Sequence, residues 1–343
     1  MEKVNNKILK LIDDNVMPGM NYGIVYDKKY FGSLGNKAVY PKKEKNEINT
    51  IYDLASITKV LVCVTIILKL VEEEKISLND NVRKYIPEYK HNDVTIKNLL
   101  THNSGLQSKF YDVHSREELI NQLLNSKRIY PVGEKVIYSD LNYILLGLII
   151  EKIYNKQLDE IAKKEVFIPL DMKDTSYNPK DIERCAPTEK LNSGLLRGTV
   201  HDWKARMLGG VAGHAGVFST VEDMTHYIEM ILNKGVYNNK QFLNEKSVDM
   251  LFKKIVFEKK RNGYRSFCYF IDKNRDIISK KYITKDNSAI LFNGYTGPVI
   301  VIDRKNKLGI MLLANRVHPK KCKNYVRRRH QIIDKIYKEL LEN

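Results

Sequence analysis

The feature that most constrains the fold is the presence of strand-like sequence at both ends of the chain. Residues 20–35 alternate apolar and polar residues around a turn at 27–29, which predicts a β-hairpin. A strand pattern returns at about 264–314, with β-branched runs on either side of a turn at 304–307. The sequence between is mostly helical. This order predicts an α+β fold, with one antiparallel sheet built from both chain ends, flanked by helices, and a mostly helical region inserted.

The chain shows no internal repeat and no linker rich in Pro, Gly or Ser. Its 343 residues therefore predict a single unit, 1–343. Within it, 1–55 and 255–343 form the sheet part and 56–254 the mainly helical part. A helix at 325–342 is expected to close the chain.

The net charge of +17 raises the question of an anionic partner. Lysines are spread along the whole chain among Asp and Glu, and no nucleic-acid-binding motif is present, so we expect no nucleic-acid partner. The densest basic run, Arg327-Arg328-Arg329-His330, is interpreted as the solvated entry to the last helix. A basic surface still favours anionic partners, among which cell-wall polymers qualify as well as nucleic acids. The oligomeric state cannot be predicted.

The N-terminal residues lack the apolar core of a signal peptide, and Val4, Ile8 and Leu11 fall at helical spacing. The longest apolar run, 60–68, is too short to span a bilayer. A cytoplasmic protein is the default expectation, although a sequence trimmed of an export signal would look the same. The four cysteines are far apart and form no CxxC, which excludes a zinc ribbon, and nothing in their spacing suggests a disulfide framework.

The stretch "YDLASITKV" carries Ser56 and Lys59 where a polar segment enters a long apolar helix. Residues at i and i+3 share a helix face. Burial and the helix dipole would both lower the pKa of Lys59, as a general base for the Ser56 hydroxyl requires. The alternative is a serine near the helix start and a lysine that snorkels to solvent. Ser56 is the only serine followed by a lysine at i+3.

Two further segments carry polar groups suited to the same chemistry. Tyr138 and Asp140 stand at the mouth of an apolar helix, where the phenol could relay a proton and the carboxylate could hold a lysine. The alternative is an ordinary cap, with Asp140 capping the helix and Tyr138 packing on the core. The strand "LFNGYTG" contains glycines that allow close approach of a substrate to the backbone; the alternative is a strand with a bulge.

The order S-x-x-K, then Y-S-D, then a glycine-bearing strand resembles the serine β-lactamase and penicillin-binding-protein superfamily. The chain is most similar to its class C β-lactamase-like serine hydrolases, which have a β-lactamase/transpeptidase-like fold. Supporting phrases such as "VTIKNLLTHNSGL" and "HDWKARMLGGVAGHAGVFSTVEDM" extend the resemblance over roughly residues 18–320.

The resemblance implies a role for each of these residues. Ser56 would be the acylated nucleophile, with Lys59 and Tyr138 sharing its proton. Backbone N–H groups of Ser56 and Tyr295 would hold the oxyanion, and Asp140 would orient Lys59 and the substrate amide. No metal and no organic cofactor are implied.

Two departures from the family pattern concern the substrate side of the site. The family often has Asn where Asp140 stands, and an aspartate would raise the pKa of Lys59. The family also has Lys or His, then Thr-Gly, on the strand. We align this triplet with Phe292, Asn293 and Gly294, although Tyr295-Thr296-Gly297 is a second alignment. Neither supplies a cation, so efficient β-lactam hydrolysis is not expected.

His214, between glycines in "GGVAGHAG", is expected to line the substrate cleft. Together with His201 and Asp202 it lacks a third metal ligand at a recognisable spacing, so no metal site is predicted.

The expected activity is acyl transfer through an acyl-serine to water, on an amide or ester of a small-molecule or peptide substrate. A muropeptide amidase or peptidase leads, followed by a carboxylesterase and then a weak β-lactamase. The rival from another class is a catalytically impaired binding or sensor protein of the same fold.

Overall fold

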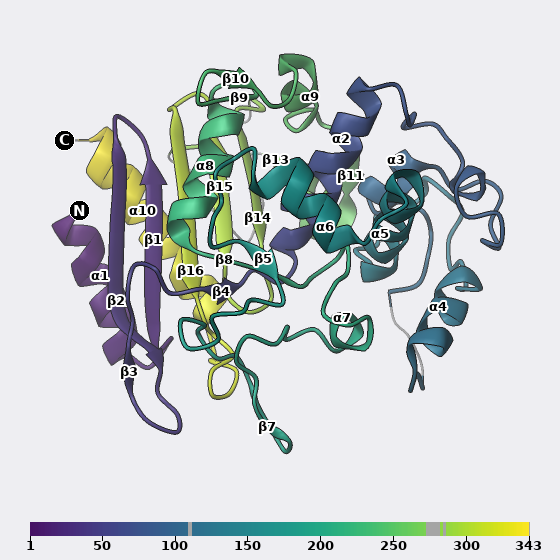
Figure 1. Ribbon diagram of the computed structural model, residues 1–343. Coiled ribbons are helices and arrows are strands. Elements are labelled where there is room, and N and C mark those ends of the chain that lie inside the picture. Colours follow the sequence, from purple (N-terminus) through teal and green to yellow (C-terminus); the bar gives the residue numbers. More distant parts are fainter. Residues whose placement is uncertain (109–111, 272–281, 284–285, 343) are drawn as a thin grey trace.

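A nine-stranded antiparallel sheet forms one half of the computed structural model (Figure 1), which describes residues 1–108, 112–271, 282–283 and 286–342. Its strand order is β11-β12-β13-β14-β15-β16-β1-β2-β3, so the last strand of the chain, β16, pairs with the first, β1. The strands are β1 Gly19–Val25, β2 Lys29–Ala38, β3 Glu44–Lys45, β11 Val256–Glu258, β12 Gly263–Arg265, β13 Phe270–Ile271, β14 Ala289–Asn293, β15 Val299–Asp303 and β16 Leu308–Ala314. The predicted sheet built from both chain ends is confirmed. Residues 272–281 and 284–285 of the predicted strand region lie outside the described residues.

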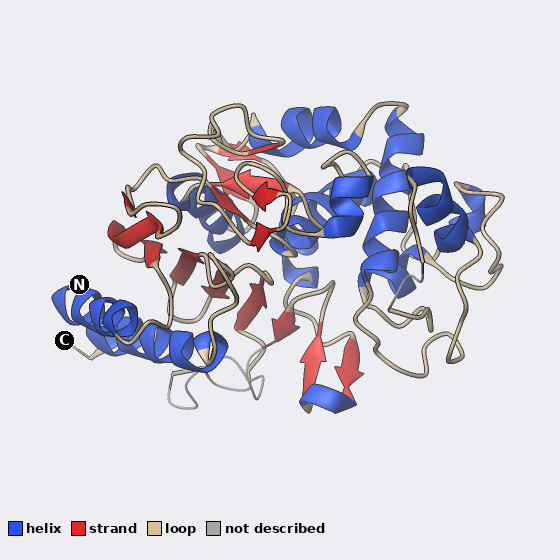
Figure 2. Cartoon of the chain, turned by 90° about the horizontal axis from the view of Figure 1, so that it is seen from below, coloured by secondary structure: helices blue, strands red, loops and turns tan. Residues whose placement is uncertain are grey.

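Helices cover both faces of this sheet. Figure 2 shows α1 (Glu2–Asp13) and α10 (Tyr325–Leu341) lying side by side, with both termini at their ends. On the other face lies α8 (Val221–Leu232). Glycine permits its close approach: a Cβ on Gly309 would lie 2.0 Å from the Ile228 side chain. The sheet region is therefore a three-layer helix–sheet–helix sandwich.

The middle of the chain is mainly helical, as the sequence predicts, and lies beside the sheet (Figure 1). Its helices are α2 Thr65–Glu72, α3 Ile96–Leu100, α4 Arg116–Leu124, α5 Asp140–Tyr154, α6 Leu158–Ala162, α7 Trp203–Met207 and α9 Glu245–Met250. Short 3-10 turns span Val82–Lys84 and Lys259–Arg261, and π-helical segments span Lys59–Val64 (η1) and Lys163–Phe167. Among the described residues, no helix has the length and apolar character needed to cross a bilayer.

Small sheets join the two parts. The strand β8 (Val217–Ser219) lies between β4 (Tyr52–Asp53) and β5 (Ser176–Tyr177). Two short hairpins complete the strands, β6 Lys190–Leu191 with β7 Gly194–Leu195 and β9 Val236–Tyr237 with β10 Lys240–Gln241. Because β4 leads directly into the segment that carries Ser56, this small sheet places that segment against the residues that follow β14.

The helix that begins near Ser56 is buried over most of its length, as its apolar sequence predicts. Every residue of η1 is buried, and so are five of the eight residues of α2. The hydrogen bond of a π-helical turn spans one more residue than that of an α-helical turn, and such turns occur frequently at functional sites. Lys59, the first residue of η1, is fully buried among these apolar side chains.

Candidate active site

Ser56 lies on the sharp turn between β4 and η1. The preceding residue, Ala55, has a φ of +46°, a left-handed conformation that costs free energy in a residue with a Cβ. Two hydrogen bonds hold the turn: the Ala55 N–H donates to the Asp53 carboxylate over 2.8 Å, and the Thr296 hydroxyl donates to the Asp53 carbonyl over 2.8 Å. The turn leaves Ser56 partly exposed while its neighbours are buried.

The ammonium group of Lys59 lies directly beneath the Ser56 hydroxyl. Its Nζ is 3.0 Å from Ser56 Oγ, 2.9 Å from the His214 carbonyl oxygen and 2.8 Å from Asp140 Oδ1. An ammonium group has three N–H donors, and here each has an acceptor. The side chain does not snorkel to solvent, because it is fully buried.

The pKa of Lys59 is raised, which overturns the expectation from the helix dipole and burial. Burial lowers the pKa of Lys59. The negative charges of Asp140 and, when ionised, Tyr138 raise it by a larger amount. The predicted effect of the aspartate therefore outweighs desolvation. At neutral pH Lys59 is an ammonium ion that donates a hydrogen bond to Ser56.

Tyr138 lies over the same ammonium group, with its ring centroid 5.1 Å from Lys59 Nζ. Burial raises the pKa of the Tyr138 phenol, while the charge of Lys59 opposes that rise. The phenol is therefore neutral at rest. The structure brings Tyr138 to Lys59 from a segment almost eighty residues away in the sequence, a contact that neither local motif reveals.

Behind Tyr138 stands His102, which sequence reasoning missed. Its ring centroid lies 4.6 Å from that of Tyr138. The backbone N–H of Ser139 and the side-chain amide of Asn142 approach His102 Nδ1 at 3.3 and 3.1 Å, so Nδ1 accepts and the ring proton is on Nε2. Burial and the charge of Arg265 keep the pKa of His102 low. The available signal was a histidine in "THNSGL", directly after a capped helix.

Asp140 is free to hold Lys59 because the neighbouring serine caps the helix. The Ser139 hydroxyl accepts the Leu141 N–H at the start of α5, which corrects the alternative that Asp140 itself is the cap. The other Asp140 oxygen pairs with Lys204 Nζ at 3.1 Å. Burial would raise the pKa of Asp140, but the charge of Lys59 and further cations hold it well below its usual range.

The ion pairs continue beyond Asp140 along the cleft. Lys204 Nζ lies 2.9 Å from Asp202, whose Oδ1 lies 2.8 Å from His214 Nε2. Asp202 also caps α7 by accepting the Lys204 and Ala205 N–H groups. The result is a chain in which the cations Lys59 and Lys204 alternate with the carboxylates Asp140 and Asp202.

Asp140, Asp202 and His214 bring their potential metal-ligand atoms within 4.8 Å of one another. The structure therefore supplies the third ligand that sequence spacing did not. However, the ammonium of Lys204 bridges both carboxylates, at 3.1 and 2.9 Å, where it already compensates their negative charge. This donor set is satisfied by a lysine and does not fit a metal ion without displacing that side chain.

The end of β14 packs against the turn that carries Ser56. A Cβ on Gly294 would lie 2.5 Å from the Leu54 carbonyl oxygen, so only glycine permits this approach. Tyr295 follows at once and lines the same cleft as Ser56. Among the described residues, neither the Ser56 N–H nor the Tyr295 N–H donates to a protein acceptor. Two N–H groups free at one cleft are what an oxyanion hole requires.

The cleft has a volume of about 360 Å³. It is lined by Ala55, Ser56, Tyr138, Asp140, His201, Asp202, Trp203, Lys204, His214, Ala215 and Tyr295. Sequence reasoning placed Ser56, Tyr138, Asp140, His214 and Tyr295 at one site, and the structure brings them together above the buried Lys59. It missed Trp203 and Lys204, and it considered Asp202 and His201 only as metal ligands.

The predicted substrate-binding residues of β14 do not line this cleft. Phe292 is 2% exposed, and its ring centroid lies 6.4 Å from that of Tyr138. Asn293 points away from Phe292, because successive strand residues face opposite sides, and lines another pocket. Gly294 contributes its backbone contact with Leu54. The cleft therefore receives no cation from this strand.

Comparison with known proteins agrees with this geometry. The Beta-lactamase family model matches residues 4–334. An N-acetylmuramyl-L-alanine amidase of Bacillus subtilis (strain 168) is 30% identical over 89% of this chain and 76% of the relative. A putative D-alanyl-D-alanine carboxypeptidase of Salmonella typhimurium is 29% identical over 91% and 78%.

Among solved structures, a class C beta-lactamase superposes with a TM-score of 0.79 at 20% identity, over 100% of this chain and 96% of that one. At 20% identity this structural likeness supports the fold alone. The family-model match over residues 4–334 supports common descent. The chain belongs to the Beta-lactamase family.

Proposed function

We propose that this protein is a serine hydrolase that cleaves an amide bond of a cell-wall-derived peptide through an acyl-serine intermediate. The observation that carries the proposal is the 3.0 Å contact between Lys59 Nζ and Ser56 Oγ, with Tyr138 over the same ammonium and free N–H groups at the cleft. The curated relatives named as an amidase and a putative carboxypeptidase support the substrate class.

The proposed reaction begins when the pair formed by Lys59 and Tyr138 loses one proton. Ser56 Oγ then transfers its proton to this pair and attacks the amide carbon. The oxyanion accepts hydrogen bonds from the Ser56 and Tyr295 N–H groups. The leaving amine takes the proton back as the C–N bond breaks, and water later hydrolyses the acyl-serine ester. Because the pKa values of Lys59 and Tyr138 are both raised, the reactive form is scarce at neutral pH.

Because the reaction needs the deprotonated Lys59–Tyr138 pair, kcat/KM should rise with pH above neutrality. Each unit of pH increases the fraction of the deprotonated pair about tenfold until its pKa is reached. The measurement is the pH profile of kcat/KM between pH 6 and 10. A profile that is flat across this range would contradict a base made of these two groups.

The proposal is tested first by covalent labelling. The protein is treated with a fluorophosphonate and with a labelled penicillin, and the adduct is located by mass spectrometry. We expect the fluorophosphonate on Ser56 and no adduct in Ser56→Ala. The matched control is Ser193→Ala, which removes an exposed serine between β6 and β7 that does not line the cleft. Absence of any adduct on Ser56 overturns the proposed nucleophile.

Substrate class is tested with a panel of an N-acetylmuramyl-L-alanine peptide, a peptide ending in D-Ala-D-Ala, and p-nitrophenyl acetate. We expect amide cleavage of at least one cell-wall peptide and its loss in Ser56→Ala. Turnover of the ester alone would favour a carboxylesterase. Tight peptide binding without turnover would favour a binding or sensor protein. The absence of a cation on the strand beside the cleft is consistent with that role.

A further inference from the structure

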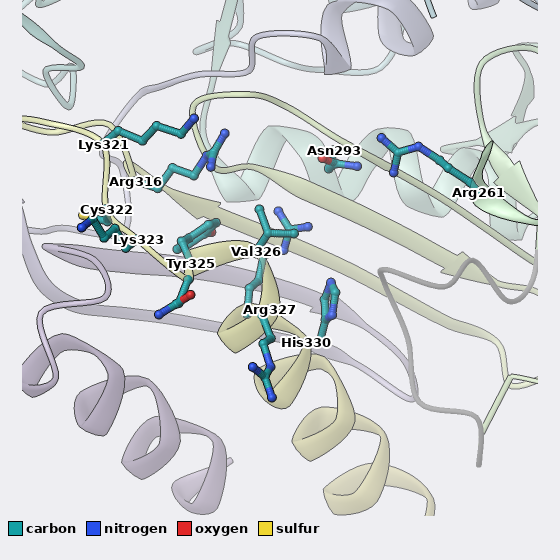
Figure 3. Close-up of a pocket in the computed structure, with 12 residues that line it drawn as sticks. Arg261, Asn293, Arg316, Lys321, Cys322, Lys323, Tyr325, Val326, Arg327 and His330 are labelled. Carbon is teal, nitrogen blue, oxygen red and sulfur yellow. The ribbon is translucent and has the colours of Figure 1, made fainter. Parts of the chain in front are cut away.

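A second and larger pocket, of about 960 Å³, lies between the start of α10 and the loop that follows β16. Figure 3 shows basic side chains from both segments around it. We call it the basic pocket and define it by Arg316, Lys321, Lys323, Arg327 and Arg329. None of its lining side chains is a carboxylate among the residues that the structure describes. Within the described part of the chain, no acidic side chain in the lining balances these cations.

The most unusual member of the basic pocket is Arg329. Its side chain is 1% exposed, and Nη1 donates to the Gly297 carbonyl oxygen over 3.1 Å. Nε and Nη2 are buried without an acceptor, and the described partners of this guanidinium are carbonyl oxygens, not carboxylates. Burial lowers its pKa, yet arginine stays charged at physiological pH. A buried charge without a counterion is costly, so it points to an anion that comes from outside.

The start of α10 adds positive potential at the same place. This helix has 17 residues, and Asn324 at its N-cap makes no side-chain capping hydrogen bond. Asn324 and the first-turn residues Tyr325 to Arg327 line the basic pocket. The N–H groups of an uncapped first turn and the helix dipole together favour an anion.

The interpretation of the run 327–330 as a solvated helix entry is therefore wrong in part. Arg328 is partly exposed and pairs with Asp14. Arg327 is exposed and lines the basic pocket, whereas Arg329 is buried beside it. One helical turn thus directs adjacent arginines to different environments, and two of them belong to one pocket.

We propose that the basic pocket binds a phosphate compound that carries several negative charges, such as one with a pyrophosphate group. A single carboxylate would balance one of five cations, whereas a pyrophosphate offers several oxygens to the arginine forks and to the helix start. The volume of about 960 Å³ also exceeds what one carboxylate fills and lies in the range of whole small-molecule sites.

The basic pocket adjoins the cleft through one residue. Arg316 Nε donates to the Tyr295 carbonyl oxygen over 2.6 Å, and Tyr295 lines the cleft. Phosphate binding goes beyond the proposed acyl transfer, because no step of that reaction uses the five cations. The two proposals therefore fail or succeed independently, and the test measures binding without turnover.

The test is isothermal titration of the full chain with sodium pyrophosphate at constant ionic strength. We expect one site, and a Kd that rises about tenfold or more in Arg327→Gln and in Lys323→Gln, since each loses a charge-assisted contact. Both side chains are exposed, so both variants should fold. The matched control is Arg328→Gln, which makes the same charge change on the next residue outside the pocket and should shift the Kd less than about twofold.

A second measurement needs no variant. Pyrophosphate added to the wild-type protein should shift the backbone amide signals of residues 324–327 in an NMR spectrum. Citrate, a polyanion without phosphate, should bind about tenfold more weakly or worse because carboxylates match this geometry less well. The proposal is overturned by absence of binding at millimolar pyrophosphate, by equal weakening in Arg328→Gln, by equal affinity for citrate, or by shifts confined to other residues.

Discussion

The cleft and the basic pocket are both rich in cations, but they treat charge in opposite ways. In the cleft, Lys59 and Lys204 each pair with a carboxylate within about 3 Å. In the basic pocket, five cations line a cavity that no described carboxylate enters. A site that must handle a short-lived charge benefits from fixed internal pairs that need no rearrangement. A site with unbalanced charge suits a stable counterion that arrives from solution.

The largest effect should come from removing the cation beneath the nucleophile. Lys59→Met is expected to lower kcat/KM about 10²–10⁴-fold. The variant loses the Lys59–Tyr138 pair that, once deprotonated, accepts the proton of Ser56. The measurement is steady-state hydrolysis of the best substrate of the panel. Arg328→Gln serves as the control, since Arg328 pairs with Asp14 and neither residue lines the cleft. Equal losses in both variants would mean that net charge, not the local contact, determines the rate.

Breaking one pair of the cleft should cost stability. Asp140→Asn leaves Lys59 buried without its counterion, so the free energy of unfolding should fall by about 3 kcal/mol at pH 7. The measurement is urea denaturation, with Asp112→Asn as a control because that carboxylate is 91% exposed. A loss no larger than in the control would show that the pair contributes nothing net.

The same variant predicts a change with pH. The native pKa of Asp140 is held below its unfolded value, so its stabilisation is fully present above about pH 4, near the unfolded pKa, and is lost as the pH falls toward the native pKa. Asp140→Asn should remove that part of the acid destabilisation. It should also lower the pKa of Lys59 and move the rise of kcat/KM to lower pH. If the pH profile of kcat/KM is the same in Asp140→Asn, Asp140 does not influence the pKa of the general base.

Two buried arginines sharpen the comparison. Arg265 pairs with Glu258 at 2.7 Å, whereas the described partners of Arg329 are carbonyl oxygens. Arg265→Met should therefore destabilise the protein by about 3 kcal/mol, while Arg329→Met should be neutral or stabilise it by about 1 kcal/mol in phosphate-free buffer. Denaturation curves of both variants give the answer. Similar losses in the two would mean that Arg329 is a structural residue already satisfied where it lies.

The smallest effect concerns the exposed rim of the basic pocket. Arg327→Gln relieves repulsion between like charges, so the melting temperature should rise by about 1 °C at low salt. In 1 M salt the gain should vanish, because the Debye length falls to about 3 Å. Differential scanning calorimetry at the two salt concentrations measures it. A lower melting temperature at low salt would show that Arg327 has a stabilising partner.

The order of elements and the motifs they carry made the fold and five cleft residues predictable. Strand patterns are local, and the i, i+3 spacing of Ser56 and Lys59 follows from helix geometry alone. The links between distant segments could not be predicted in this way. Lys204 meets Asp140 across more than sixty residues, and His102 reaches Tyr138 from a different helix end. Such contacts depend on packing, which no spacing rule encodes.

The same limit explains the error in the pKa of Lys59. The helix start and its apolar surroundings are visible in the sequence, and both lower a lysine pKa. The compensating charge of Asp140 arrives at 2.8 Å only after folding. The sequence comparison anticipated that an aspartate at position 140 would raise the pKa of Lys59. That this rise exceeds the effect of burial depends on the short distance between the two side chains. In a similar way, only the structure shows that Asn293 faces away from the cleft.

The burial of Phe292 bears on how readily this protein could become an antibiotic-resistance enzyme. Its ring lies within 6.4 Å, centroid to centroid, of Tyr138, Tyr269 and Phe270. A lysine at this position would place an unpaired charge among aromatic rings, near the cations already beside Tyr138. This charge would destabilise the folded protein, whatever it did for drug binding. The surrounding aromatic residues would have to change first. We therefore expect that Phe292→Lys alone would not produce an efficient β-lactamase.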